Sequence, residues 1–140
     1  MAGEAPYRLD DQIGYLLRLA GQRHVALFQS LMEHDLTPTQ FAMLIRLGEV
    51  GQGSQNQLGR MIGMDVATTK GVIDRLKAKA LITLAADPAD SRRRLIALSE
   101  DGIKLLPALQ ALGHQITDAT LGDLDKAERA TLLALLRRIS

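Results

Sequence analysis

The chain has 140 residues, of which 17 are Lys or Arg and 16 are Asp or Glu, so its formal net charge at pH 7 is +1. This length predicts one domain that buries its own core. The absence of cysteine excludes disulfides, thiolate zinc sites and thiol redox sensors. No apolar run reaches the roughly 20 residues of a membrane span, and residues 1–11 lack a basic start followed by an apolar stretch, so we expect a cytoplasmic protein.

Charge is unevenly distributed along the chain. Residues 51–99 hold eight Lys or Arg against four Asp or Glu, whereas acids outnumber bases in the remainder. A basic middle between acidic flanks is typical of a nucleic-acid-binding face on an otherwise neutral protein. A solvated surface with chance asymmetry is the alternative interpretation.

The first predicted element is a long helix. Residues 1–9 show no periodicity and are expected to form a loose arm. Asp10 or Asp11 can cap a helix that ends near His34-Asp35. Its apolar stripe, at steps of three and four, is Ile13, Leu16, Leu17, Ala20, His24, Leu27, Phe28 and Leu31. This helix is too long to be covered by one small domain. A second helix, Phe41 to Leu47, follows the capping sequence of residues 37–40.

Residues 54–80 predict a helix-turn-helix. Ser54 and Gln57 form a reciprocal cap for a short helix that Gly63 ends, and Asp65 can cap the next helix, residues 65–80. The inward stripe of this second helix is Thr69, Val72, Ile73, Leu76 and Ala80. The opposite face is small, hydroxylated or charged, and consists of Ala67, Thr68, Lys70, Gly71, Asp74 and Arg75. Such a face suits the major groove of DNA.

A hairpin is predicted after this helix. Residues 81–85 and 95–98 read as strands, with turn residues at 87–91 and then three consecutive arginines, Arg92 to Arg94. Two strands with a polar tip beside a helix-turn-helix indicate a wing.

Two further helices are predicted at the C-terminal end. Residues 99–101 start the first, whose stripe is Ile103, Leu106, Leu109, Leu112 and Ile116 and which Pro107 should kink. Gly122 ends it, and Asp125 with Glu128 caps the last helix, whose apolar residues are Leu132, Leu133, Leu135, Leu136 and Ile139. The terminal helices hold more leucine than one small core can use, which predicts a homodimer.

Three runs carry a family resemblance: residues 76–82, residues 87–92 and residues 98–102. In these runs and in the order of its predicted elements, the chain resembles the multiple-antibiotic-resistance regulator (MarR) family. The resemblance implies a mainly α fold with a small β-hairpin, a winged helix-turn-helix with N- and C-terminal dimerisation helices. It implies one domain, 1–140, in which 10–35 and 99–140 dimerise and 37–98 form the DNA-binding lobe. It also implies a homodimeric repressor that a ligand releases from a pseudo-palindromic operator of double-stranded DNA.

The expected DNA-binding residues lie in the helix-turn-helix and the wing. They are Ser54, Gln55, Ala67, Thr68, Thr69, Lys70, Asp74, Arg75, Asp90, Arg92, Arg93 and Arg94. Three consecutive arginines alternate between both faces of a thin ribbon, which favours contact with phosphates or the minor groove. The Asp90 carboxylate can hold the Arg92 guanidinium in position. The alternative is that the charged side chains of the helix only face solvent and that the arginines at the hairpin tip only increase solubility.

The expected effector site lies on the first helix. His24 is on the apolar stripe, near Arg18 and Arg23, where it could bind an anionic or aromatic ligand. The run 11–18 with residues 22–24 resembles family members that control aromatic-acid catabolism, so an aromatic acid or its coenzyme A thioester is the expected effector. The candidates are Gln12, Tyr15, Arg18, Arg23, His24 and Phe28. A satisfied core or interface histidine is the alternative role for His24.

The sequence holds no catalytic constellation. Its three histidines lack ligand partners at helical spacing, no glycine-rich phosphate loop follows a strand, and no serine lies in a nucleophile elbow. We therefore expect neither an enzyme nor a bound cofactor or metal. A winged-helix protein-interaction module without specific DNA binding is the alternative function, and the salt dependence of binding distinguishes the two.

Overall fold

The computed structural model describes residues 5–140, so the first part of the predicted arm lies outside the described residues. These residues form two compact units. One comprises the chain up to Leu31 together with His114–Ser140, and the other comprises Met32–Gly113. The predicted division into dimerising helices and a DNA-binding lobe is a functional one and stays a prediction.

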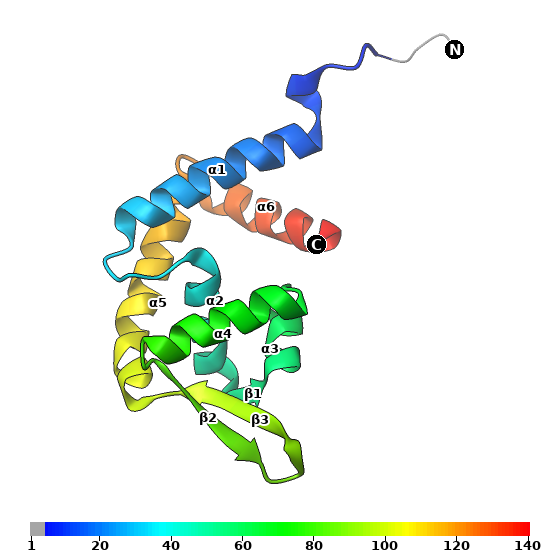
Figure 1. Ribbon diagram of the computed structural model, residues 1–140. Coiled ribbons are helices and arrows are strands. Elements are labelled where there is room, and N and C mark those ends of the chain that lie inside the picture. The colour runs from blue at the N-terminus through cyan, green and yellow to red at the C-terminus, as the bar shows by residue number, and fades with distance from the viewer. Residues whose placement is uncertain (1–4) are drawn as a thin grey trace. The chain divides into compact units, whose positions relative to one another are not determined.

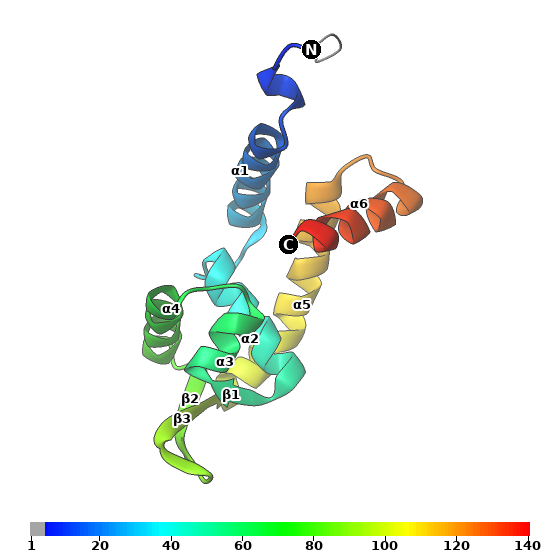
Figure 2. The ribbon, with the colours of Figure 1, turned by 90° about the vertical axis from the view of Figure 1, so that its right-hand side faces the viewer.

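The unit 32–113 is a winged helix-turn-helix. It contains α2 (Pro38–Val50), β1 (Gln52–Ser54), α3 (Gln55–Met61), α4 (Val66–Ala78), β2 (Ile82–Asp87), β3 (Asp90–Leu98) and the first part of α5 (Glu100–Leu121). The strands form an antiparallel sheet in the order β1-β3-β2. The β2–β3 hairpin extends away from α2, α3 and α4 in both views (Figures 1 and 2). The predicted fold class is confirmed.

Three capping sequences start the helices of this unit as predicted. Thr37 and Ser54 each accept a hydrogen bond from the backbone N–H three residues later, at 3.3 Å, and Gln40 and Gln57 complete the reciprocal bonds. The Asp65 carboxylate accepts from the Thr68 N–H at 2.7 Å. Because caps satisfy backbone groups that have no partner inside the helix, they fix where each helix begins.

The sheet has one strand more than predicted. β1 pairs with β3 through Gln52 opposite Ala97 and Ser54 opposite Leu95, in a stretch for which no strand was predicted. A strand of three residues that include Gly53 is too short to show an alternating pattern.

Helix α2 was predicted to end at Leu47 but continues to Val50. Its Gly48 is a packing position, because a Cβ there would lie 2.5 Å from Leu106 Cδ2.

The wing strands are longer than predicted. Strand β3 begins at Asp90 and includes Arg92, Arg93 and Arg94, and Ala86 pairs with Arg94. The turn is confined to the two residues between β2 and β3. Both faces of this part of the ribbon are largely exposed, so its strands lack the apolar alternation that marks a half-buried strand.

Helix α4 ends at Ala78, two residues before the predicted end. Ala80 is exposed and has a φ of 58°, so the prediction that it lies on the buried stripe was wrong. The left-handed conformation lets the Leu81 N–H reach the Leu76 carbonyl at 3.1 Å and closes the helix. Glycine usually occupies this position, and its absence concealed the helix end.

The core of this unit lies between α2, α3, α4, the sheet and α5. Its buried members are Leu36, Met43, Leu44, Leu47, Leu58, Val72, Ile73, Leu76, Ile82, Ile96 and Leu109. Burying each such side chain contributes about 1.5–3 kcal/mol. This core holds α4 by one face only and leaves the other face exposed.

The start of α5 is fastened to the end of α4. The Ser99 hydroxyl accepts from the Gly102 N–H at 3.0 Å and donates to the Ala80 carbonyl at 2.7 Å. A Cβ at Gly102 would lie 2.3 Å from the Leu81 carbonyl oxygen. Backbone cannot move aside as a flexible side chain can, so a side chain is not accommodated there.

Gly102→Ala is therefore expected to destabilise the protein by about 1–3 kcal/mol, measured as the free energy of unfolding in urea. Gly71→Ala in α4 is the matched control, because its Cβ would meet only Arg75 Nη1, at 3.6 Å. The control should be neutral or slightly stabilising, since alanine favours helix more than glycine does. Equal stability of the two variants would contradict the prediction.

The other unit contains α1 (Ile13–Leu31), the end of α5 and α6 (Lys126–Ile139), preceded by a short 3-10 turn, η1 (Leu9–Asp11). Helix α1 is shorter at both ends than predicted. Helix α5 includes Pro107 and ends at Leu121, and the next residue, Gly122, has a φ of 58°. The predicted Asp125–Glu128 capping box is present.

Two arginines fasten the turn between α5 and α6. Arg23 of α1 donates to the Thr120 carbonyl and, at 2.8 Å, to the Ala119 carbonyl. Arg129 of α6 forms an ion pair with Asp118 at 2.8 Å and donates to the carbonyls of Leu124 and Gly122 at 2.9 Å. These bonds satisfy carbonyl groups that the end of α5 leaves without helical partners. None of the described helices is long and apolar enough to cross a membrane.

Candidate functional site

The outward face of α4 is exposed and is held in place by the buried one. Ala67, Thr68, Lys70, Asp74 and Arg75 are all exposed. The buried residues of the helix are Thr69, Val72, Ile73 and Leu76. Because the core fixes the helix along its whole length, the outward side chains have a defined position relative to α3 and the wing.

The first turn of α4 is fixed electrostatically as well. The hydrogen bond from the Thr68 backbone N–H, aided by the Thr68 hydroxyl, holds the pKa of the Asp65 carboxyl below its ordinary value. A lowered carboxyl pKa means that this cap contributes stability above the ordinary carboxyl pKa. The contribution is lost as the pH falls through the pKa of the folded state. At neutral pH the cap is intact.

Thr69 has to be removed from the predicted DNA-binding residues. Its side chain is only 1% exposed, and its hydroxyl donates to the Asp65 carbonyl at 2.7 Å. A Cβ on Gly59 of α3 would lie 2.5 Å from Thr69 Oγ1, so the two helices meet here. Thr69 is a packing residue of the helix-turn-helix, as its place on the inward stripe indicated.

Lys70 and Asp74 form an ion pair across one helical turn, with Lys70 Nζ 2.9 Å from Asp74 Oδ2. Their side chains are 68% and 60% exposed. An exposed pair of this kind contributes little to stability, so both groups can exchange partners without loss of fold. The Lys70 ammonium is available to base edges or phosphates, and the Asp74 carboxylate is available to base amino groups.

A recess lined by four arginines lies between α3 and the wing, with a volume of about 490 Å³. Its lining is Ser54, Gln55, Asn56, Gln57, Arg60, Leu84, Arg92, Arg93, Arg94 and Ile96. The wing arginines are exposed, so their charges meet solvent and any bound polyanion. The structure thus brings Ser54 and Gln55 next to the three predicted arginines of the wing.

Asp90 orients Arg92 as predicted. Its Oδ1 accepts from the Arg92 backbone N–H at 3.0 Å and lies 3.4 Å from Nε. The Arg92 side chain remains 91% exposed. The carboxylate therefore restrains the base of the guanidinium and leaves its outer N–H groups free to bind an anion.

Asn56 and Arg60 of α3 were not among the predicted residues, although the recess includes both. Ser54, their neighbour in sequence, is 7% exposed and uses its hydroxyl in the cap. Their spacing of four residues, which puts both on one face of α3, was the available signal.

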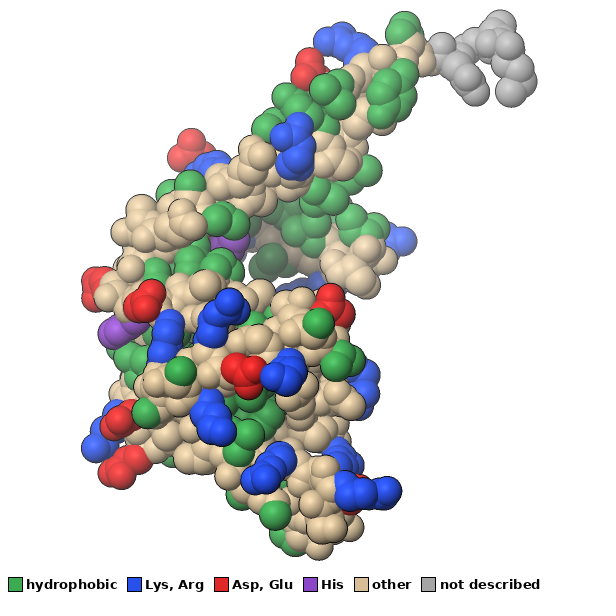
Figure 3. Space-filling view, in the orientation of Figure 1, with side chains coloured by type: hydrophobic (Ala, Val, Ile, Leu, Met, Phe, Trp, Pro, Cys, Tyr) green, Lys and Arg blue, Asp and Glu red, His purple; other side chains and the backbone are tan. Residues whose placement is uncertain are grey.

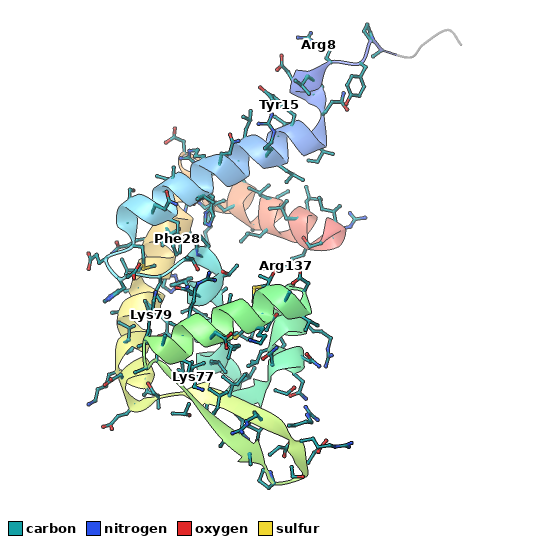
Figure 4. All side chains as sticks on the ribbon, viewed as in Figure 1. Arg8, Tyr15, Phe28, Lys77, Lys79 and Arg137 are labelled. Carbon is teal, nitrogen blue, oxygen red and sulfur yellow. The ribbon has the colours of Figure 1, made fainter. Side chains whose placement is uncertain are left out.

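Figure 3 shows lysine and arginine side chains gathered over α4 and the hairpin on the viewed face. Lys77 and Lys79 lie at the C-terminal end of α4 (Figure 4), where Lys79 donates to Gln40 Oε1 at 3.0 Å.

An apolar groove of about 530 Å³ lies within the unit formed by α1, α6 and the end of α5. Its lining is Ile13, Leu16, Leu17, Ala20, His24, Thr117, Thr120, Leu121, Leu124, Leu132, Leu133 and Leu136. His24 Nδ1 lies 2.8 Å from Thr120 Oγ1. Among the groove residues, His24 is the one with an imidazole side chain, and its hydrogen bond with the Thr120 hydroxyl occupies one of the two ring nitrogens.

The six predicted effector residues do not line one site. His24 lines the groove, whereas Arg23 is engaged with carbonyl groups of α5. Arg18 stacks on Tyr15, with its guanidinium carbon 5.5 Å from the ring centre.

The remaining two candidates also lie outside the groove lining. Gln12 donates to the Arg8 carbonyl at 2.8 Å, and Phe28 is 3% exposed. Tyr15 and Phe28 lie towards opposite ends of α1 (Figure 4), about 20 Å apart at roughly 1.5 Å per residue. One small ligand cannot touch both within this unit.

The described residues contain no group of three or more His, Cys, Asp or Glu side chains that could hold a metal ion. The two surfaces of interest are therefore a basic one on the helix-turn-helix and wing and an apolar one beside α1 and α6.

Comparison with known proteins agrees with this geometry. A model of the MarR family matches residues 34–93. The HTH-type transcriptional repressor NicR of Pseudomonas putida is 40% identical over 135 residues, which cover 96% of this chain and 85% of that protein.

Solved structures agree over nearly the whole chain. A probable transcriptional regulator from Pseudomonas aeruginosa is 49% identical with a TM-score of 0.91, covering 95% of this chain and 100% of that one. Bordetella bronchiseptica BpsR is 41% identical with a TM-score of 0.91, covering 96% and 97%. The family and fold predictions are thus confirmed, and because these relatives are transcription regulators, so is the expectation that the chain is not an enzyme. The chain belongs to the MarR family of transcription regulators.

Proposed function

We propose that the protein is a ligand-relieved repressor that binds a pseudo-palindromic operator as a homodimer. The observation that carries the DNA-binding part is the exposed face of α4 lying in the same compact unit as a recess with four arginines. A helix that is held by one face can place its other face in the major groove, and a basic ribbon beside it can bind the flanking phosphate backbone. The name of the relative NicR, a transcriptional repressor, supports the sign of regulation.

Salt dependence tests whether the basic surface binds DNA. Each phosphate contact releases counterions, so the affinity should fall steeply and linearly on a log–log plot of binding constant against salt concentration. Selection of genomic fragments on the purified protein, followed by sequencing, should recover an inverted repeat. A shallow slope with no enriched sequence would favour the protein-interaction module instead.

The division of roles between α4 and the wing gives a separate prediction. Thr68→Ala and Lys70→Ala should change the ranking of operator variants, since removing a side chain that reads a base costs about 1–3 kcal/mol. Arg92→Ala should weaken all sequences similarly and reduce the salt slope by about one for each phosphate that is no longer neutralised. Competition binding against a set of single-base operator variants measures both effects. If the wing variant changed the sequence preference and the helix variants did not, the roles would be reversed.

The homodimer is supported by apolar surface on α1 and α6. Exposed side chains there include Ile13 at 62%, Leu135 at 51% and Ile139 at 65%. A monomer in water gains nothing from such a surface, whereas a second copy covers it. A two-fold dimer also presents two copies of α4, which match successive major grooves when they lie about 34–36 Å apart.

The effector we propose is an aromatic carboxylic acid, free or as a coenzyme A thioester. In BpsR, 6-hydroxynicotinic acid regulates DNA binding. Hydroxylated pyridine carboxylates are therefore the first members of this class to test. In this chain the groove offers apolar cover for a ring, and the free ring nitrogen of His24 offers a polar partner for a carboxylate. Titration of such acids into the protein–operator complex, followed by anisotropy, should show release of the DNA.

A further inference from the structure

Val66 is the first residue of α4 and the most exposed large apolar side chain of the described unit 32–113, at 67%. It belongs neither to the core nor to the partly buried side chains packed against it. The helix start does not depend on it, since Asp65 and Thr68 form the cap. A β-branched residue also gains nothing in helix propensity at this position. The folded chain by itself thus gives no reason for a valine here.

Val66 lies on the exposed surface of the helix-turn-helix. It borders a shallow recess of about 200 Å³ between α3 and α4, together with Asn56 and Arg60. Its neighbours Ala67 and Thr68 are exposed too. The N-terminal residues of a recognition helix are those that reach base edges in the major groove.

An apolar side chain can recognise one feature of a base edge in the major groove. Valine neither donates nor accepts a hydrogen bond, so the amino, carbonyl and ring nitrogen groups of the bases give it no partner. The C5-methyl group of thymine is the apolar feature displayed there.

We propose that Val66 determines specificity by contacting a thymine methyl group in each operator half-site. This inference rests on the proposed function, because it requires α4 to read bases. It adds a specificity residue outside the set predicted from the sequence, and it requires the preferred sequence to contain a thymine at the position that Val66 reaches.

The test uses a duplex selected by the full-length protein from a random pool. Each thymine of that duplex is replaced in turn by deoxyuridine, which removes the C5-methyl group and keeps the pairing. One thymine position in each half-site should be sensitive to this replacement. Replacing that thymine in one half-site should lower the affinity of the wild-type protein about four-fold, the effect of losing the burial of one methyl-sized group. Replacing it in both half-sites should lower the affinity about 15-fold.

Val66→Ala should bind the thymine duplex more weakly than the wild type and should bind the thymine and deoxyuridine duplexes equally at that position. Ile103→Ala on α5 is the matched control, because Ile103 is also apolar and 60% exposed. It should retain the full thymine preference. Since Val66 is exposed, thermal unfolding of its variant should match that of the wild type.

The outcomes separate the two claims. A selected sequence whose binding is indifferent to every thymine methyl, or a Val66→Ala variant that keeps the full preference, overturns the inference and leaves the proposed function standing. If the wild-type protein enriches no sequence from the pool, the proposed function itself fails.

Discussion

Deleting residues 125–140 is expected to abolish dimerisation and operator binding together. Helix α6 supplies Leu132, Leu133 and Leu136 to the groove whose opposite wall comes from α1. Without it, Leu16 and Leu17, already 46% and 44% exposed, become more exposed still. No residue of α6 is fully buried in the single chain, so the expected loss comes from burial across the proposed dimer. A leucine that becomes fully buried there contributes about 1.5–3 kcal/mol, and losing several such contributions exceeds what the assembly can tolerate. Sedimentation measures the mass and fluorescence anisotropy measures DNA affinity.

A point variant separates loss of the dimer from loss of the fold. Leu135→Arg places a charge on a side chain that is 51% exposed and lines two shallow surface depressions beside α6. It should dissociate the dimer while the helical circular dichroism stays unchanged. Ala134→Arg is the control on the same helix, since Ala134 lines none of these surfaces. A truncated chain that stayed soluble and monomeric with full operator affinity would refute the dimer.

The elements that the sequence predicted well depend on local chemistry. Thr37, Ser54, Asp65 and Asp125 each satisfy backbone groups within three residues, and such bonds can be inferred from spacing alone. The end of α4 could not be inferred in this way. Ala80 adopts a positive φ that alanine rarely adopts, and its carbonyl is fastened to Ser99, 19 residues later.

The exposed face of α4 was predictable for a similar reason. Helical periodicity separates the exposed Lys70 and Arg75 from the buried Val72 and Leu76. The error at Thr69 came from assigning a side chain of the inward stripe to the outward face.

On α1 the sequence could not distinguish a binding arginine from a structural one. The partners of Arg23 are carbonyl groups 96 and 97 residues away, and no local pattern indicates them. The surplus of leucine was visible in the sequence, but the groove that these residues line requires the packing of three helices.

His24→Ala is expected to leave operator affinity nearly unchanged and to abolish release of the operator by aromatic acids. The imidazole is partly buried, lines the groove and is oriented by the Thr120 hydroxyl 2.8 Å away. Its other ring nitrogen is the partner we propose for the ligand carboxylate. A ligand acts only through its different affinity for two states of the dimer, and a ten-fold fall in operator affinity requires about 1.4 kcal/mol of coupling. Removing one hydrogen bond to a charged group, about 1.5–3 kcal/mol, is enough to abolish that effect.

The measurement is a titration of 6-hydroxynicotinic acid, other aromatic acids and their coenzyme A thioesters against the protein–operator complex, followed by anisotropy. His114→Ala is the matched control, because His114 is an exposed histidine of α5 outside the groove lining, and it should respond like the wild type. Arg23→Ala should lower the free energy of unfolding and not only the response to ligand, because Arg23 donates hydrogen bonds to the end of α5. If His24→Ala prevents folding or dimerisation, the histidine is a structural residue that satisfies Thr120, and the effector binds elsewhere.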